Sequence, residues 1–347
     1  MSLGQRVTVL FGQNGQGKSN LLEAAYYAIT FRSFRTSSIG DLIGWDSPRA
    51  EIEAGIVLAG LERCLRVEIA VGKKRTTLDG KVVRRDSESL RGAGVVIFGP
   101  EDLRLPKAAA AERRRAVDRA VFAVQRTYYR EALDFERALK GRNGVLRRGE
   151  LSRDLLESYD ETLARTGARI VCRRRALVRQ LAPIVASIFE EIHGNLPARI
   201  SYRSHALVEA AEGERDIELA LRTGLEAERG NDQRRGFTGF GPQTDDLEML
   251  LGERPAREHG SQGQIRSLVL AFKIGELRHA EAENGETPVL LLDDVASELD
   301  HERRTRLFET ISAMACQTLI TVTEREHLPD LSGRADWRVS DGHVEPA

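Results

Sequence analysis

The octapeptide GQNGQGKS at residues 12–19 constrains the fold of this chain more than any other feature. It matches G-x-x-x-x-G-K-[ST], the phosphate-binding P-loop. The apolar, β-branched run Val7–Phe11 predicts a buried strand before it, and residues 20–25 predict a helix after it. Because such a turn directs backbone N–H groups into an anion-sized hollow at a helix N-terminus, it predicts a nucleotide phosphate site. The flanking strand and helix argue against the alternative, a glycine turn with a chance Lys-Ser pair.

Each part of the P-loop has an expected role in binding ATP. Lys18 is expected to reach the β- and γ-phosphates, and the Ser19 hydroxyl to bind Mg²⁺. The residues predicted to contact the nucleotide are Gly12, Asn14, Gly15, Gly17, Lys18, Ser19 and Asn20.

The composition of the chain constrains how it can bind nucleic acid and in which cellular compartment it is expected. The 347 residues carry 52 Lys+Arg and 53 Asp+Glu, a net charge of −1, so any contact with nucleic acid must use a local patch. The three cysteines are scattered, which predicts neither a disulfide framework nor a metal site. We find no signal peptide and no apolar run long enough to span a bilayer, and therefore expect a cytoplasmic protein with no membrane contact.

Residues 50–85 predict an antiparallel β subdomain attached to the nucleotide domain. Apolar residues alternate with polar or small ones, and Asp79-Gly80 is a hairpin signal. Lysine and arginine side chains gather at the strand ends. Two interpretations of them are open: an ordinary solvated hairpin face, or contacts with the phosphate backbone of DNA. The candidate DNA contacts are Lys73, Lys74, Arg75, Arg84 and Arg85.

The chain from residue 108 to about 192 is strongly helical in pattern. Apolar residues repeat every seven positions, which keeps one stripe facing a partner helix, for which residues 125–140 are the candidate. We expect residues 141–144 to form a bend and Arg173–Arg175 to face solvent, where these arginines are the alternative to the β hairpin as a DNA contact. The stripe consists of Leu156, Leu163, Ile170, Leu177 and Ile184.

Two later segments complete the predicted nucleotide site. Residues 289–292 form an apolar strand that ends in Asp293 and Asp294, a Walker B pattern. Asp293 is expected to reach the Mg²⁺ shell and Asp294 to orient or deprotonate the attacking water; purely structural carboxylates are the alternative. Residues 261–264, with sequence SQGQ, open a helix whose N-terminus can bind an anion. We expect the P-loop and Walker B strands to lie side by side in one mainly parallel sheet.

The order of these motifs is that of ABC-type ATPases, and the chain closely resembles the RecF family of bacterial DNA replication and repair ATPases. The resemblance runs through nearly the whole chain. It rests on residues 12–20, 98–103, 113–115 with Asp118, 241–247, 261–264 and 290–300. The last of these segments, LLLDDVASELD, is highly specific.

The resemblance implies an α/β fold: an ABC-type P-loop ATPase head with an antiparallel β subdomain and an inserted helical arm. Residues 1–107 would form the first part of the head, 108–235 the arm (lobe II), and 236–347 the second part of the head. Two heads of a homodimer would sandwich ATP, with Ser261 and Gly263 acting in trans on the P-loop of the partner. The resemblance also implies ATP-dependent dimerisation on double-stranded DNA, weak DNA-dependent hydrolysis, and cooperation with RecR and RecO in repair, replication restart and the SOS response.

The sequence departs from the family pattern at several points. Family members usually have strands upstream of the P-loop, whereas this chain starts close to it, and Gln243 and Thr244 replace the usual His-Arg pair. The first rival interpretation is a nucleotide-binding subunit of a membrane transporter, which usually carries a Leu-Ser-Gly-Gly-Gln signature and a histidine where this chain has Thr323. The second is an ATP-sensing defence protein, but we recognise no nuclease or protease constellation in the sequence.

Overall fold

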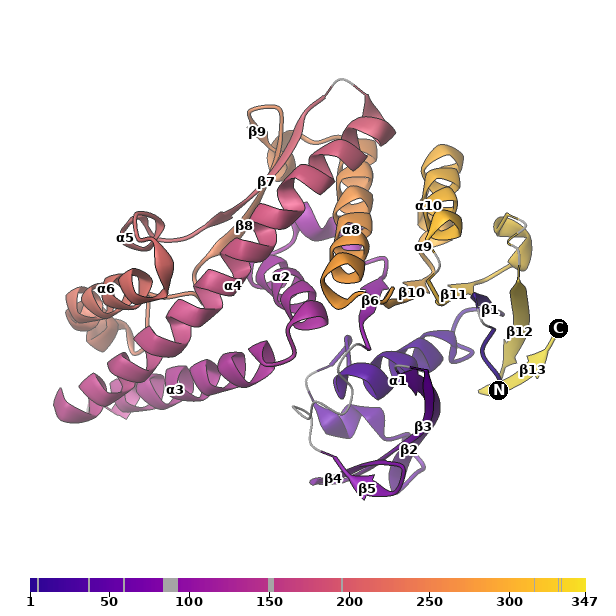
Figure 1. The fold of residues 1–347 in the computed structure, drawn as a ribbon. Coiled ribbons are helices and arrows are strands. Elements are labelled where there is room, and N and C mark those ends of the chain that lie inside the picture. Colours follow the sequence, from indigo (N-terminus) through magenta and orange to yellow (C-terminus); the bar gives the residue numbers. More distant parts are fainter. Residues whose placement is uncertain are drawn as a thin grey trace. The chain divides into compact units, whose positions relative to one another are not determined.

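Two compact units make up the computed structural model. One consists of Met1–Leu103 with Glu276–Ala347, and the other of Arg104–Gly275 (Figure 1). Residues 236–275 therefore pack with the helical arm, whereas the prediction grouped them with the second part of the head. The functional division into 1–107, 108–235 and 236–347 stays a prediction. The structure describes all residues except 5, 37, 59, 84–92, 149–152, 195, 315, 330 and 332, and the side chains of 296, 297 and 327.

A six-stranded sheet forms the centre of the first unit. Its strand order is β13-β12-β1-β11-β10-β6, and all neighbouring strands are parallel except the edge pair β12 and β13. The strands are β1 (Val7–Phe11), β6 (Val95–Phe98), β10 (Val289–Asp293), β11 (Thr318–Val322), β12 (Arg334–Ser340) and β13 (His343–Pro346).

The P-loop strand β1 and the Walker B strand β10 lie in this one sheet, but they are not neighbours. Strand β11 separates them, so the expectation that they lie side by side is wrong. All five residues of β11 are buried, as in a strand covered on both faces. Apolar runs predict such strands but not their order, because every buried parallel strand has the same pattern.

Helix α1 (Lys18–Thr30) joins the central sheet to a second, antiparallel sheet. Leu22 and Tyr26 of α1 pack in a core with Leu10, Ile97 and Leu291 of the central sheet. Other α1 residues pack with the antiparallel sheet in a second core cluster, which contains Tyr27, Phe31, Leu65, Val67 and Leu78. The sheet consists of β2 (Arg49–Leu58), β3 (Leu61–Ala70), β4 (Lys73–Leu78) and β5 (Lys81–Val82).

The predicted β hairpin is confirmed within this subdomain. Asp79 and Gly80 both have positive φ, 49° and 77°, and connect β4 to β5. Aspartate tolerates this conformation and glycine adopts it without a Cβ clash, which is why this dipeptide favours the turn. The Asp79 carboxylate also accepts a hydrogen bond from the Cys64 N–H at 2.8 Å, so it ties the turn to β3. Arg84 and Arg85 lie outside the described residues.

Shorter elements complete the first unit. They are α9 (Val295–Glu298), α10 (His301–Ala313) and the 3₁₀ segments Ile39–Leu42 and Arg325–His327. No helix among the residues that the structure describes is long and apolar enough to cross a membrane.

The second unit is a helical arm that carries a small antiparallel sheet. Its long helix α4 contacts α3 and α6 (Figure 1). The predicted apolar stripe is buried from Leu156 to Leu177, and Ile184 is partly exposed. The 3₁₀ segment Asp102–Lys107 leads into this unit, and α8 (Gln262–Asn284) begins in it. The other elements are α2 (Ala110–Val124), α3 (Tyr128–Arg148), α4 (Arg153–His193), β7 (Ala198–Arg203), α5 (Ala206–Glu209), α6 (Gly213–Arg235), β8 (Asp246–Leu251), β9 (Arg254–Pro255) and α7 (Ala256–His259).

The bend expected at residues 141–144 is absent, because α3 continues as a helix through this segment. A Cβ added to Gly141 would lie 2.6 Å from a ring carbon of Tyr159 on α4. This glycine therefore allows two helices to approach closely. Sequence alone does not distinguish a glycine that breaks a helix from one that admits a neighbouring side chain.

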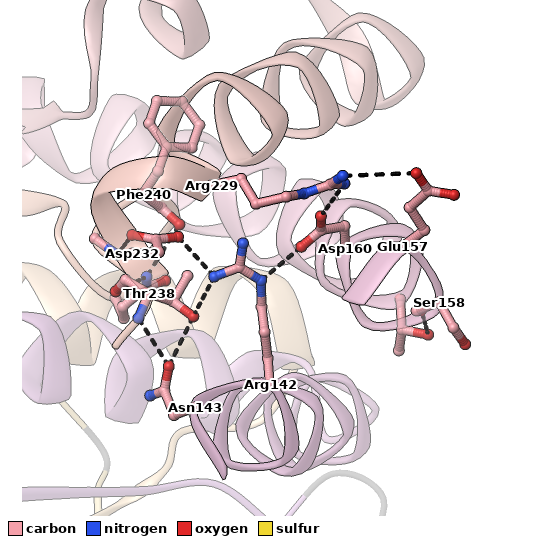
Figure 2. A network of polar contacts seen from close by, with 12 residues as sticks. Arg142, Asn143, Glu157, Ser158, Asp160, Arg229, Asp232, Thr238 and Phe240 are labelled. Carbon is pink, nitrogen blue, oxygen red and sulfur yellow. Dashed lines mark hydrogen bonds and ion pairs between the residues drawn. The ribbon is translucent and has the colours of Figure 1, made fainter. Parts of the chain in front are cut away.

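A buried ionic network holds α3, α4 and α6 together (Figure 2). Arg142 is fully buried and donates to Asp160 and to Asp232, each at 2.6 Å, and to the Thr238 hydroxyl at 2.8 Å. Asn143 accepts from the same hydroxyl at 2.7 Å. One arginine thus fixes the positions of three helices and of the loop that follows α6.

Arg173–Arg175 do not form the expected solvated face. Arg173 forms an ion pair with Glu131 at 2.5 Å, and Arg174 one with Asp118 at 2.7 Å. Arg175 donates to the backbone oxygens of Ala211 and Val208 at 3.0 and 2.6 Å. The expectation failed because guanidinium groups can cross-link an arm by pairing with acids and carbonyls far away in the sequence.

Candidate nucleotide-binding site

The P-loop is packed closely against the C-terminal hairpin. Gly12 has φ +154°, and a Cβ on it would lie 2.2 Å from the Val339 carbonyl oxygen of β12, so only glycine fits. The Gly342 N–H of the β12–β13 turn donates to the Gln16 carbonyl at 3.3 Å. Gly17 is the N-cap residue of α1 and adopts the left-handed conformation, so the P-loop leads directly into the N-terminus of the helix.

Lys18 lies over its own loop. Its ammonium donates to the carbonyl oxygens of Gly12 and Gln13, the latter at 2.8 Å. Burial lowers the pKa of Lys18, while the negative charges of Asp294 and Asp293 act in the opposite direction. The cation thus lies at the mouth of the loop, where phosphate oxygens would replace these carbonyls as acceptors.

Ser19 and Asp293 are brought together from distant parts of the chain. The Ser19 hydroxyl donates to Asp293 Oδ1 at 2.8 Å, because β1 and β10 both end at the same edge of the sheet. A hydroxyl and a carboxylate suit Mg²⁺, which usually takes few protein ligands and completes its shell with water and phosphate. No cluster of three or more His, Cys, Asp or Glu side chains that could hold a metal ion occurs in the described part of the chain.

Asp294 follows Asp293 in an unusual backbone conformation. Its φ is 51° and its ψ 25°, a left-handed geometry that aspartate tolerates better than most residues. The Asp294 N–H donates to the carbonyl and to the hydroxyl of Thr321, at 3.2 and 2.9 Å. Asp294 directly follows Asp293, the candidate Mg²⁺ ligand, in the sequence. The negative charge of its carboxylate raises the pKa of Lys18, against the effect of burial.

Two residues near the site were not singled out by the sequence reasoning. Arg35, which follows α1 in the chain, donates to Asn20 Oδ1 at 2.8 Å, and its guanidinium lies 3.5 Å from the Glu23 carboxylate. Thr321 of β11 is the other. The sequence signal that could have identified it is a threonine that interrupts the apolar run of a buried strand.

Ser261 and Gly263 lie at the start of α8, as predicted. The Ser261 N–H donates to Gln264 Oε1 at 2.9 Å, and the Gln264 N–H donates to the Ser261 hydroxyl at 3.2 Å. This reciprocal pair is a capping box, which explains the Ser-x-x-Gln spacing structurally. Both residues belong to the second unit and Lys18 to the first, so their action on a nucleotide stays a prediction.

The described cations of the β hairpin have different surroundings. Lys74 Nζ lies 4.6 Å from the ring centroid of Tyr27 and donates to the Phe31 carbonyl at 3.3 Å, so it packs the hairpin against α1. Arg75 stands opposite Glu68 in the strand ladder. Lys73 is exposed at the start of β4.

Gln243 and Thr244 close the loop in which they lie. The Gln243 amide donates to the carbonyls of Thr238 and Phe240 at 3.3 and 3.1 Å. The Thr244 hydroxyl donates to the Gly241 carbonyl at 2.7 Å. The two residues that depart from the family pattern therefore stabilise a local turn.

Comparison with known proteins identifies the family to which the chain belongs. A relative from Geobacter sulfurreducens named DNA replication and repair protein RecF is 39% identical over 100% of this chain and 95% of its own length. A second, from Myxococcus xanthus and with the same name, is 42% identical over 91% of this chain and 84% of its own length. The chain belongs to the RecF family. No family model matches the sequence.

Solved structures support the RecF assignment independently. The recombination mediator protein RecF-ATPrS of the RecFOR pathway superposes with a TM-score of 0.90 at 30% identity, covering 100% of this chain and 93% of that one. A corresponding RecF-ATP structure gives 0.89 at 31%, with coverage of 100% and 92%. An Smc head from Pyrococcus furiosus, at 14% identity and a TM-score of 0.54, shares the fold alone. The fold is thus that of an ABC-type P-loop ATPase head with a β subdomain and an inserted helical arm.

Proposed function

We propose that this RecF-family protein is an ATP-switched DNA-binding protein of recombinational repair and replication restart. The observation that carries the proposal is the meeting of Lys18, Ser19 and Asp293 at the carboxyl edge of one sheet. The similarity of this chain to a solved structure of RecF with ATP supports ATP as the nucleotide.

The residues of the site divide the chemistry of hydrolysis among them. Lys18 neutralises the β- and γ-phosphates, and Ser19 and Asp293 hold Mg²⁺, which neutralises charge on the phosphate oxygens when bound. Asp294 orients or deprotonates the attacking water. The P-loop N–H groups, from Asn14 to Asn20, position the phosphates without supplying a charge of their own.

A second copy of the chain completes the site. Its Ser261 and Gly263 would face the γ-phosphate across the dimer interface, so ATP holds the dimer together and hydrolysis releases it. In this cycle hydrolysis is slow and stimulated by double-stranded DNA. The RecFOR pathway named for the similar structures supports RecR, together with RecO, as the partners that the DNA-bound dimer assists.

The rival functions receive less support. Residues 260–264 read GSQGQ, which lacks the leucine of the usual transporter signature, and Thr323 follows β11 where transporters carry a histidine. The long cross-linked arm also suits the RecF family, since the Geobacter and Myxococcus relatives align with at least 91% of this chain.

The β hairpin provides the first test of DNA binding. The double variant Lys73→Ala/Arg75→Ala should lower affinity for double-stranded DNA equally for all sequences. It should also reduce the slope of log K against log salt by about one unit for each phosphate that the variant no longer neutralises. Binding is measured with and without ATP between about 50 and 200 mM salt.

Two controls sharpen this test. Lys74 is left unchanged because its contact with Tyr27 stabilises the subdomain, so a thermal melt should not move. ATP-dependent dimerisation should also persist. Unchanged DNA affinity and salt slope would exclude Lys73 and Arg75 as phosphate contacts; Arg84 and Arg85 then become the candidates to substitute.

A further inference from the structure

Thr321 is a buried polar residue within the otherwise aliphatic run Leu319–Val322 of β11. Only 1% of it is exposed. A buried hydroxyl stabilises a fold only when it is hydrogen-bonded, and a valine would otherwise suit this position better. The hydrogen bonds that Thr321 makes therefore explain its presence.

Those bonds join the two acidic residues of the Walker B motif. The Thr321 hydroxyl donates to Asp293 Oδ1 at 2.8 Å and accepts from the Asp294 N–H at 2.9 Å. Thr321 stands directly opposite Asp293 in the pairing of β11 with β10. One side chain thus contacts both the predicted Mg²⁺ ligand, Asp293, and the backbone of the predicted catalytic residue, Asp294, from the neighbouring strand.

The contact with Asp293 fixes the orientation of its carboxylate. Oδ1 accepts from two hydroxyls, those of Ser19 and Thr321, each at 2.8 Å. Because these donors come from different elements, together they restrict rotation of the carboxylate plane. The direction in which Asp293 presents its oxygens to a metal is therefore determined partly by Thr321.

The contact with Asp294 stabilises a backbone conformation of higher energy. A non-glycine residue at φ 51° costs free energy that surrounding contacts must offset. The N–H of Asp294 is held by both the hydroxyl and the carbonyl of Thr321. Removal of the hydroxyl would take away the shorter of these two bonds, so the Asp294 side chain would be less well placed.

We propose that Thr321 is a positioning residue for ATP hydrolysis. It orients the Mg²⁺-binding carboxylate of Asp293 and stabilises the backbone conformation that places the Asp294 side chain. The inference rests on the proposed ATPase function. Nucleotide binding itself uses Lys18 and the P-loop amides, with which Thr321 has no hydrogen bond among those of the described residues. Thr321 should therefore affect turnover and the Mg²⁺ requirement more than the affinity for ATP.

The test compares Thr321→Val with Thr321→Ser, because serine keeps the hydroxyl and valine keeps the shape. Thr318→Val is the matched control: Thr318 is fully buried on the same strand, and its hydroxyl contacts only Cys316 among the described residues. Three quantities are measured on the full chain. They are kcat and KM for ATP, the Mg²⁺ dependence of binding a non-hydrolysable ATP analogue, and the melting temperature.

For Thr321→Val we expect kcat to fall roughly 10- to 100-fold, as is typical when a group that orients a metal ligand is removed. The Mg²⁺ concentration for half-maximal analogue binding should rise severalfold, and metal-free nucleotide affinity should stay unchanged. Thr321→Ser and Thr318→Val should resemble the native protein in kcat and Mg²⁺ requirement.

Native kcat and Mg²⁺ requirement in Thr321→Val would overturn the inference, as would a Thr321→Ser protein as impaired as the valine variant. If Thr321→Val does not fold, the serine variant is compared with Thr321→Ala, and equal Mg²⁺ requirements in that pair exclude the positioning role. Failure of the ATPase proposal is recognised separately, since the native protein would then bind or hydrolyse no ATP.

Discussion

Asp294→Asn should reduce ATP hydrolysis by about 10²- to 10⁴-fold while ATP binding is retained. Asparagine cannot accept the proton of the attacking water, but it preserves the size of the side chain. It also tolerates the left-handed conformation that Asp294 adopts at φ 51°, so the loop should keep its shape. With ATP bound and hydrolysis blocked, the dimer should accumulate and persist.

Two measurements check this result. Single-turnover hydrolysis gives the decrease in the rate of chemistry, and sedimentation with ATP gives the lifetime of the dimer. Asp293→Asn is the informative comparison, because it alters the carboxylate that contacts Ser19 and should raise the Mg²⁺ requirement. Hydrolysis by Asp294→Asn at the native rate would show that Asp294 has been assigned wrongly.

Arg142→Met should lower the free energy of unfolding of the second unit by about 3–5 kcal/mol. Methionine approximates the aliphatic stem but removes the charge that pairs with Asp160 and Asp232. Asp232 is fully buried, so its carboxylate cannot turn to water when Arg142 is removed, whereas Asp160 keeps its ion pair with Arg229 at 3.0 Å. The large cost comes from leaving buried acids without this cation, not from the net strength of the pairs.

Denaturant unfolding measures this effect, and Arg137→Met supplies the control. Arg137 lies on the same helix, but its side chain is 71% exposed, so its ion pair with Asp134 should contribute at most about 1 kcal/mol. Adding Asp232→Asn to Arg142→Met should recover part of the stability, since one buried charge is then removed. An Arg142→Met protein as stable as the control would contradict the structural role of the network in Figure 2.

Sequence reasoning succeeded where the signal was local. The P-loop, the Asp79-Gly80 turn and the strand before Asp293 each depend on neighbouring residues, whose dihedral preferences and polarity the sequence records directly. The RecF resemblance then supplied the fold, which similarity to solved RecF structures confirms.

Features that depend on distant partners could not be predicted in the same way. The order of buried strands depends on the whole sheet, so β11 between β1 and β10 was not foreseen. Gly141 was interpreted as a bend because its partner, Tyr159, lies on another helix. Thr321 was missed for the same reason, since its importance appears only when β11 and β10 are paired.

The central claim, that two chains share each ATP site, is tested most directly by mixing two inactive variants. Lys18→Ala should bind no nucleotide and form no dimer. Ser261→Arg should bind ATP as a monomer but neither dimerise nor hydrolyse it. In a mixture, the only intact site pairs Lys18 of the Ser261→Arg chain with Ser261 of the Lys18→Ala chain. Hydrolysis that appears on mixing, and is absent from each variant alone, is the predicted result. Full hydrolysis by monomeric Ser261→Arg protein would contradict the account.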